Sequence, residues 1–383
     1  MAGAAVLTGA DQLLDKHTAL IRGKRVGLIT NATGVDNRLR PTIDLLFDSK
    51  ICRLVAIFGP EHGARGEAQA GARIEHGIDA KTGVRVYSLY GGTTRPTREM
   101  LSGIDVLVYD IQDIGARYYT FISTLFHCMQ AAAEAQIPFV VLDRPNPING
   151  RDVGGNLLDM KFTSFVGIAP IPMRYGMTPG ELARYFNGEF GFKADLTVVP
   201  MTGWKRNQWF DETGLPWIFP SPNIPTLESA TVYPGWCLIE GTNLSEGRGT
   251  TRPFELVGAP WIDGLSLAEA LNSLRLPGVL FRPVWFTPTF SKHKDLACSG
   301  IQVHVVDRNR FDPVRTVLHF LRIAERLYPG QFEYRDSGFD RLAGTDTLRR
   351  QLRDHAVNID GIVEGWKSEL DRFAKIRQKY LLY

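Results

Sequence analysis

A glycine-rich stretch, FGPEHGARGEAQAG (58–71), gathers residues suited to acid–base and anion chemistry. Carboxyl groups and imidazoles transfer protons, arginines bind anions, and glycines let a ligand approach the backbone closely. Glu61 follows Pro60 directly after the apolar run VAIFG. We therefore expect a rigidly held, half-buried carboxyl group with a raised pKa, as a general acid requires. His62 is expected to support it and Glu67 to reach the same space, the alternative being a turn or a helix cap.

Three other motifs place polar side chains directly after apolar runs. They contribute Asn31 in TNATG, Asp110 and Asp113 in YDIQDIG, and Asn146 in DRPNP. The two aspartates are candidates for catalysis, and the two asparagines are candidates for substrate binding. For Asp113 the alternative is a cap on a helix that begins near Tyr118.

A second cluster of charge, EGTNLSEGRGTTR (240–252), combines charged and amide side chains with small residues. Its glycines permit close approach to a ligand, and its hydroxyl, amide and guanidinium groups suit a polyhydroxylated or anionic molecule. The alternative is an inter-domain hinge held by salt bridges. The residues that we assign to substrate binding here are Glu240, Asn243, Glu246, Arg248 and Arg252.

The elements that must position these residues alternate in type along the first half of the chain. Apolar strands are expected in 25–35, 53–63, 84–90, 105–115, 138–150 and 195–201, and helices in 41–49, 97–103, 121–136 and 178–191. Continuous apolar strands separated by helices indicate a parallel sheet covered on both faces. We predict an α/β fold, with a Rossmann-like, mostly parallel sheet domain over 1–230.

The second half predicts a smaller α+β auxiliary domain over 231–383 that contributes to the cleft. A strand is expected in 299–307, a helix in 312–328, and one long amphipathic helix in 361–383. In open α/β sheets, ligands bind at the carboxyl ends of the strands. The polar motifs of the first half all follow such ends, so we expect their loops to meet at one site.

Aromatic side chains near these motifs could stack on sugar rings, although core packing is their usual role. The candidates are Tyr118, Tyr119, Trp217, Tyr233 and Trp236. The stretch 203–235 is rich in tryptophan and proline, and we expect it to form an ordered wall or groove.

Several common chemistries lack their sequence signatures. The chain contains no GxGxxG or GxxxxGK[ST] motif, no HExxH motif and no GxSxG motif. The cysteines at 52, 128, 237 and 298 are far apart and read as buried free thiols. We therefore predict no cofactor and no metal, with a metal site built from Glu61, His62, His76 and Asp110 as the minor alternative.

The composition is that of a globular protein with a substantial core. Of 383 residues, 44% are hydrophobic and 22% are charged, and the formal net charge is +3. No basic stripe predicts a nucleic-acid partner, and no apolar run approaches the roughly 20 residues that span a bilayer. The first residues do not resemble a leader, so we expect a cytoplasmic protein, or a periplasmic or secreted one if a signal peptide has been removed.

Five motifs in a fixed order together resemble the exo-β-N-acetylmuramidase family, formerly a domain of unknown function. They are GPEHGARGEAQAG, YDIQDIGARYYTF, LDRPNPING, PMRYGMTPGELA and YPGWCLIEGTNLSEGRGTTRPFE. The resemblance implies a Rossmann-like domain with a smaller auxiliary domain. It implies a glycoside hydrolase that releases N-acetylmuramic acid from the non-reducing ends of peptidoglycan fragments, with Glu61 as the catalytic residue.

This chemistry would need a second group besides Glu61, and a cation for the lactyl carboxylate of N-acetylmuramic acid. The second group could be a carboxylate, or the acetamido group of the substrate itself. The candidate carboxylates are Glu67, Asp110, Asp113 and Glu246. The candidate cations are Arg65, Arg117, Arg248 and Arg252. The alternative functions are a non-catalytic muropeptide-binding protein and a metal-dependent hydrolase of another cell-wall bond.

Overall fold

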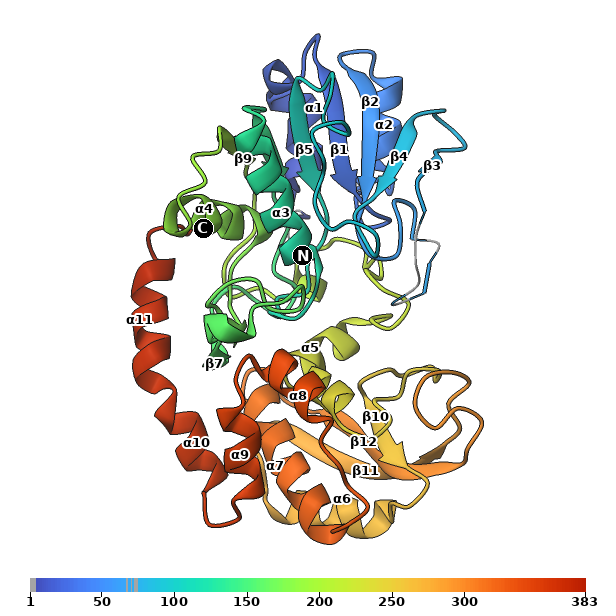
Figure 1. Ribbon diagram of the computed structural model, residues 1–383, viewed down its shortest axis with the longest axis vertical. Coiled ribbons are helices and arrows are strands. Elements are labelled where there is room, and N and C mark those ends of the chain that lie inside the picture. The colour runs from blue at the N-terminus through green and yellow to red at the C-terminus, as the bar shows by residue number, and fades with distance from the viewer. Residues whose placement is uncertain (1–4, 67, 70, 72–74) are drawn as a thin grey trace.

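The computed structural model describes residues 5–66, 68, 69, 71 and 75–383, which form two lobes (Figure 1). The first lobe holds a seven-stranded sheet in the order β3-β4-β2-β1-β5-β6-β9. Every pairing is parallel except that of β3 with β4. The predicted mostly parallel α/β fold is therefore confirmed. The strands are β1 (Arg25–Thr30), β2 (Arg53–Gly59), β3 (Gly77–Ile78), β4 (Arg85–Ser88), β5 (Val106–Asp110), β6 (Phe139–Leu142) and β9 (Leu196–Val199).

Helices cover both faces of this sheet, because its central strands are apolar on both sides. On one face α1 (Gly9–Lys16) and α2 (Thr42–Asp48) pack on residues such as Leu28 and Val108. On the other face α3 (Phe121–Glu134) and α4 (Pro179–Glu189) pack on Phe139 and its neighbours. Two short antiparallel strands, β7 (Gly154–Leu157) and β8 (Pro172–Arg174), complete the lobe.

The second lobe is built on a three-stranded antiparallel sheet in the order β10-β12-β11. Its strands are β10 (Leu256–Ala259), β11 (Val279–Phe286) and β12 (Cys298–Val305), and α6 (Gly264–Ser273) and α7 (Pro313–Leu327) lie beside them. Two shorter helices, α8 (Asp336–Ala343) and α9 (Thr347–Arg353), follow. This mixture of helices and an antiparallel sheet is the smaller α+β lobe that the sequence predicts.

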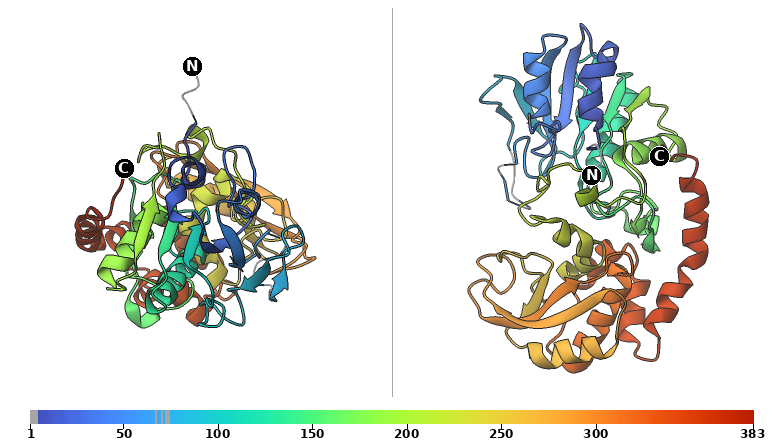
Figure 2. Two further views of the ribbon diagram at one scale, coloured as in Figure 1. Left: turned by 90° about the horizontal axis from the view of Figure 1, so that it is seen from above. Right: turned by 180° about the vertical axis from the view of Figure 1, so that it is seen from behind.

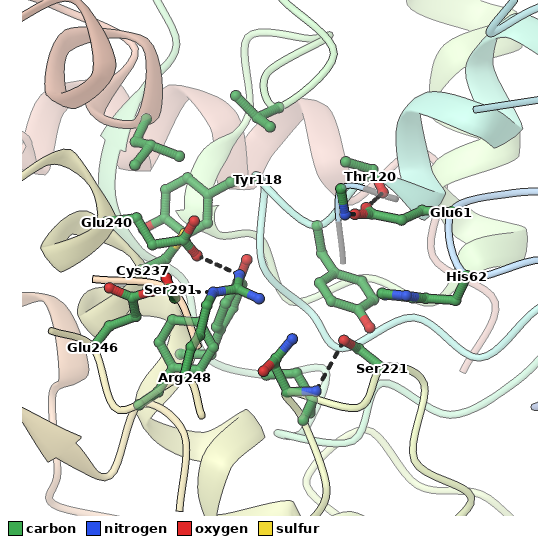
Figure 3. A pocket seen from close by; sticks show the side chains of 18 of the residues that line it. Glu61, His62, Tyr118, Thr120, Ser221, Cys237, Glu240, Glu246, Arg248 and Ser291 are labelled. Atoms are coloured by element: carbon green, nitrogen blue, oxygen red, sulfur yellow. Dashed lines mark hydrogen bonds and ion pairs between the residues drawn. The ribbon is translucent and has the colours of Figure 1, made fainter. Parts of the chain in front are cut away.

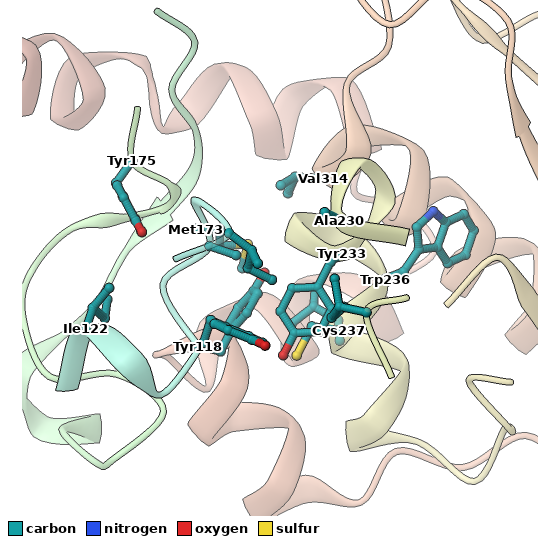
Figure 4. Packing of buried hydrophobic residues seen from close by; sticks show 14 of the residues in the cluster. Tyr118, Ile122, Met173, Tyr175, Ala230, Tyr233, Trp236, Cys237 and Val314 are labelled. Carbon is teal, nitrogen blue, oxygen red and sulfur yellow. The ribbon is translucent and has the colours of Figure 1, made fainter. Parts of the chain in front are cut away.

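The helix α5 (Leu227–Trp236) joins the lobes, and a hydrophobic core runs through their junction. Figure 4 shows Tyr118 and Met173 of the first lobe beside Tyr233 and Cys237 of the connecting segment. All four are at least 94% buried. Because this apolar contact is continuous, the loops at the junction are held against each other rather than hinged across water.

The C-terminal segment differs from its prediction of a single long helix. It forms α10 (Ile359–Gly365) and α11 (Lys367–Arg377), which meet at Trp366. A glycine at the end of α10 favours such a break. The last residues return to the first lobe (Figures 1 and 2), where the Tyr383 hydroxyl donates to Asp143 at 2.8 Å. The region after 230 therefore contributes to both lobes.

The helix predicted over 97–103 is also wrong, since this segment forms successive turns. It lies between Pro96 and Gly103, and Gly103 has a φ of +78°. A glycine with a positive φ ends a helix, so the segment has a stop signal at its last residue. Among the described residues, no helix combines the length and apolarity needed to cross a membrane.

Candidate active site

A pocket of about 520 Å³ opens where the carboxyl end of β2 faces α5 and the loops of the second lobe. Figure 3 shows Glu61 and His62 on one side of it, and Glu240, Glu246 and Arg248 on the other. Its walls come from segments that are distant in the sequence. The lining residues are Glu61, His62, Gly71, Tyr90, Tyr118, Tyr119, Thr120, Val166, Ser221, Asn223, Ile224, Tyr233, Cys237, Glu240, Glu246, Arg248, Phe254, Phe290, Ser291, Lys292, Arg335 and Leu342.

Glu61 is held at the rim of the first lobe by neutral partners, namely Gly71, Thr120 and the phenol of Tyr90. One carboxylate oxygen accepts the Gly71 N–H at 3.0 Å, and the other accepts the Thr120 hydroxyl at 2.9 Å. The phenol of Tyr90 lies close enough that its pKa is raised, chiefly by burial and then by the charge of Glu61. Within the described residues no cation pairs with Glu61. The carboxyl group is therefore fixed in direction but is not neutralised by an ion pair.

His62 follows in a left-handed backbone conformation, with a φ of +75°. This conformation is uncommon outside glycine and costs on the order of 1–3 kcal/mol. Its Nδ1 lies 2.9 Å from the Ala68 carbonyl oxygen. Burial lowers the pKa of His62, so the ring is neutral at neutral pH, with Nδ1 donating to that carbonyl and Nε2 left as an acceptor.

The opposite wall is a closed network of charges from the loop after α5. Arg248 binds Glu240 at 2.9 Å and Glu246 at 3.2 Å, and Lys292 binds Glu246 at 2.9 Å. The Lys292 ammonium also donates to the carbonyl oxygens of Ile239 and Thr242. Within the described residues, Oε2 of Glu240 makes no hydrogen bond. One oxygen of Glu240 is thus available to a ligand, whereas both oxygens of Glu246 lie in ion pairs, even though its buried Oε2 has no hydrogen bond within the described residues.

Charge and burial act in opposite directions on Glu240. Burial raises the pKa of Glu240, and the adjacent Arg248 opposes that rise. The same pair raises the pKa of Arg248, although burial works against it. A carboxylate with a raised pKa is a better proton acceptor than an exposed one.

Aromatic rings form the floor between these walls. Tyr233 packs edge to face against Tyr118, Tyr119 and Phe254, with centroid separations of 6.0, 5.8 and 4.8 Å. Ser221 and Asn223 of the segment SPNIP also line the pocket, so the predicted wall at 203–235 does contribute one side. Two predicted platforms do not line it, because Trp236 packs on Phe320 in the core and Trp217 packs on Phe210.

Of the residues predicted to act on substrate, six line the pocket. They are Glu61, His62, Tyr118, Glu240, Glu246 and Arg248. Glu67 lies outside the described residues. The remaining eight are placed elsewhere, where each has a structural partner.

The strand-end side chains of Asn31, Asp110 and Asn146 do not line the pocket, although we expected all of these loops to meet there. Asp110 is fully buried and pairs with Arg144 at 2.6 Å, and Asn31 accepts hydrogen bonds from Thr33. Asn146 donates to the Met177 carbonyl oxygen. These loops bond to one another beneath the pocket, because a buried polar group needs a partner. The loop after β2 reaches the cavity through Glu61 and His62, and the loop after β5 reaches it only at its far end, through Tyr118–Thr120.

Asp113 is buried and does not line the pocket. Its Oδ2 accepts the Gly115 N–H at 2.8 Å and the Tyr175 hydroxyl, so it does not cap α3, which begins after Thr120. Burial raises the pKa of Asp113 to about 7. It is a titrating group below the site rather than one that can touch a ligand in the pocket.

Three of the predicted arginines are committed away from the pocket. Arg65 binds Asp79 at 2.6 Å and Asp44 at 2.9 Å, and the half-exposed Arg252 binds Glu255 at 3.2 Å. Arg117 is fully buried and donates to four carbonyl oxygens, two of them in α8 of the other lobe. Asn243 likewise holds the backbone of 331–333. None of these four residues lines the pocket, and their assignment to substrate binding stays a prediction.

Several pocket residues were not predicted from the sequence. Tyr90, Lys292 and Arg335 lie in segments with no distinctive local pattern, whereas Ser221 and Asn223 lie in the stretch 203–235 that was predicted as a wall. Thr120 lies within the YDIQDIGARYYTF motif, which was the available signal for it. Lys292 and Arg335 enter from the loop after β11 and the start of α8, which only the packing of the second lobe brings to the site.

A metal site would require a group of side chains that could bind the ion. Within 5–66, 68, 69, 71 and 75–383, no three His, Cys, Asp or Glu side chains gather closely enough to hold an ion. His76, one of the residues of the metal alternative, accepts the Ser88 N–H instead. The donors that do gather are those of hydrogen bonding and proton transfer.

Comparison with known proteins places both lobes in one family. The model described as Exo-beta-N-acetylmuramidase NamZ, N-terminal, matches residues 26–228, and its C-terminal counterpart matches 231–383. The peptidoglycan beta-N-acetylmuramidase NamZ of Bacillus subtilis (strain 168) is 52% identical over 379 residues, which cover 99% of this chain and 91% of that protein.

Solved structures agree over the whole length. A crystal structure of a DUF1343 family protein from Bacteroides fragilis NCTC 9343 is 42% identical, with a TM-score of 0.92 and full coverage of both chains. A second DUF1343 protein of that organism is 32% identical, with a TM-score of 0.80 and 99% coverage of each chain. The two matched domains, the identity and the shared fold lead to one conclusion: the chain belongs to the exo-β-N-acetylmuramidase family, a family of glycosidases.

Proposed function

We propose that this protein is an exo-acting glycoside hydrolase that releases N-acetylmuramic acid from the non-reducing end of peptidoglycan fragments. The observation that carries the proposal is the pocket itself, in which Glu61 and Glu240 face the cavity from opposite lobes (Figure 3). Two carboxyl groups flanking a glycosidic bond are the usual requirement for its hydrolysis. The floor of tyrosines and the Ser221–Asn223 wall suit a sugar ring.

Glu61 is proposed as the general acid. Its oxygens are oriented by Thr120 and Gly71, which are neutral, so no ion pair within the described residues competes for the proton that an acid must carry. It would protonate the leaving oxygen as the bond to the anomeric carbon breaks. The neutral His62 beside it offers Nε2 to a substrate hydroxyl.

Glu240 is proposed as the second carboxylate. Its free oxygen, its raised pKa and its position across the pocket suit a group that accepts a proton from the attacking water. Glu246 is less suited, because both of its oxygens are held by Arg248 and Lys292. The acetamido group of the substrate remains the alternative to Glu240 as the second group.

The experiment compares the wild type with Glu61→Gln on two substrates, the disaccharide MurNAc-β-1,4-GlcNAc and 4-nitrophenyl β-N-acetylmuramide. A sugar leaving group needs protonation, whereas nitrophenolate leaves readily without it. An acid role therefore predicts a loss in kcat of about 10³-fold on the disaccharide and a much smaller loss on the nitrophenyl substrate. Glu99→Gln, an exposed glutamate outside the pocket, is the matched control.

Equal losses on both substrates would show that Glu61 acts in another way than as the acid. An unchanged rate in Glu61→Gln would remove it from catalysis altogether. If the wild type released nothing from either substrate but bound N-acetylmuramic acid, the non-catalytic binding protein would be favoured. Loss of sugar hydrolysis on chelation would favour the metal-dependent alternative.

A further inference from the structure

Three positively charged side chains line the pocket, and one of them has no ion-pair partner among the described residues. Arg248, Lys292 and Arg335 line it, and the first two are bound to Glu240 and Glu246. Within the described residues, the side chain of Arg335 makes no hydrogen bond and no ion pair. A guanidinium that lines a cavity without a carboxylate partner is a ready site for an anion.

The backbone of Arg335 is fixed although its side chain is not. Its N–H donates to the Gly241 carbonyl oxygen at 2.8 Å, and its carbonyl accepts the Phe339 N–H at 2.8 Å. Gly241 lies so close to α8 that a Cβ there would be 2.5 Å from the Phe339 Cα. The start of α8 is thereby anchored to the loop that carries Glu240. The backbone of Arg335 therefore has a defined position relative to the charge network, while its side chain is exposed.

The charge of Arg335 affects the pKa of Lys292 in that network. Burial lowers the pKa of Lys292, Glu246 and Glu240 oppose this, and Arg335 adds a smaller effect in the lowering direction. The other charged groups at the pocket, Glu61 and Arg248, do not pair with Arg335. An anion bound beside Arg335 would relieve the repulsion between the two cations.

We propose that Arg335 binds the lactyl carboxylate of N-acetylmuramic acid and so distinguishes it from N-acetylglucosamine. This inference rests on the proposed function, since the lactyl ether is the group by which the two sugars differ. A carboxylate that leaves water for a pocket needs charge-assisted hydrogen bonds, and a guanidinium can supply two in parallel.

The other arginines offered by the sequence fit this role less well. Arg65, Arg117 and Arg252 do not line the pocket. Arg248 does, but its guanidinium is shared between Glu240 and Glu246. A substrate carboxylate at Arg248 would have to enter next to two existing anions, which costs free energy.

The test is a two-by-two comparison of kcat/KM. The enzymes are the wild type and Arg335→Leu, and the substrates are 4-nitrophenyl β-N-acetylmuramide and the same compound with its lactyl carboxylate converted to a primary amide. The wild type should lose about 10- to 100-fold on the amide, the range of a charged hydrogen bond. Arg335→Leu should lose about as much on the acid and show little preference between the substrates. Arg335→Lys should keep part of the preference, because it keeps the charge but not the fork.

Arg341→Leu is the matched control, since Arg341 is an exposed arginine of the same helix that does not line the pocket. Its preference should equal that of the wild type. A wild-type preference retained in Arg335→Leu, or an equal rate of the wild type on acid and amide, would overturn the proposal.

Failure of the proposed function has a different outcome, namely no hydrolysis of either compound by the wild type. In that case calorimetry decides, with N-acetylmuramic acid and N-acetylglucosamine as the ligands. Tighter binding of N-acetylmuramic acid by the wild type, lost in Arg335→Leu but kept in Arg341→Leu, would support the assignment. Equal binding of the two sugars by the wild type would contradict it.

Discussion

The two walls of the pocket hold their carboxyl groups in opposite ways. On the first lobe, Glu61 is bonded to a hydroxyl and a backbone N–H, and the carboxyl of Asp113 below it also has only neutral partners. On the second lobe, Glu240 and Glu246 share Arg248, and Lys292 completes the network. A guanidinium stabilises the anion of a neighbouring carboxyl group, but at Glu240 burial outweighs Arg248 and the pKa is raised. Among the described residues that line the pocket, the arginines and the lysine thus all belong to the wall of the second lobe.

The largest expected effect that tests this difference is on Glu240. Glu240→Gln removes the proposed proton acceptor but keeps an oxygen for Arg248, so we expect kcat to fall by about 10²- to 10³-fold with a small change in KM. The measurement is steady-state kinetics on the MurNAc-GlcNAc disaccharide. Near wild-type activity would transfer the second role to the acetamido group of the substrate.

Glu246 should instead matter for stability. Glu246→Gln leaves Lys292 and Arg248 buried with less compensating charge, and we expect a loss of about 3 kcal/mol in the free energy of unfolding. Urea denaturation measures it. Arg350→Gln breaks an exposed pair with Asp346 and should cost less than about 0.5 kcal/mol. Similar losses in both variants would mean that the network is not a structural support.

Asp113 allows the first lobe to be tested by pH. Burial raises its pKa to about 7 from 3.8, so the folded protein holds a proton that the unfolded chain releases. The resulting stability is present below about pH 4 and is lost as pH rises towards 7. Asn has no proton to lose, so Asp113→Asn should gain about 2 to 3 kcal/mol relative to the wild type between pH 5 and 8.

Urea unfolding at several pH values measures this gain. The control is Asp105→Asn, because Arg25 lowers the pKa of the exposed Asp105 to about 2 and it does not titrate in that range. Its difference from the wild type should be constant with pH. A constant difference for Asp113→Asn as well would show that a cation or water neutralises Asp113.

Thr120 gives the smallest effect. Thr120→Val keeps the shape of the side chain but removes one of the neutral donors that orient Glu61. A single hydrogen bond of this kind is worth about 1 kcal/mol, so we expect kcat on the disaccharide to fall about 5-fold with little change in KM. Thr124→Val, in the same helix but outside the pocket, should leave kcat unchanged. A loss approaching that of Glu61→Gln would mean that Thr120 does more than orient the carboxyl.

The sequence was a good guide to the fold and an uneven one to the site. Apolar strands such as 53–59 and 106–110 specify a buried parallel sheet by their composition, and they form one. The long helix predicted at the C-terminus fails at Trp366, because periodicity continues across a break that the preceding glycine permits. Polar residues at strand ends were harder to interpret. Asp110 and Glu61 both follow an apolar run. Asp110 nevertheless forms a buried ion pair with Arg144, whereas Glu61 lines the pocket.

What the sequence determined by itself was local. The hydrophobic pattern set the elements of the first lobe, Thr178 with Glu181 capped α4, and the glycines around Glu61 and Arg248 permitted left-handed turns. The tertiary structure decided which charges would be paired. Arg117 hydrogen-bonds across the two lobes, and Arg248 pairs with Glu240. Arg335 lines the pocket because α8 packs beside it. Ion pairing depends on distances between residues in the folded protein. Residue types and their spacing along the chain do not specify these distances.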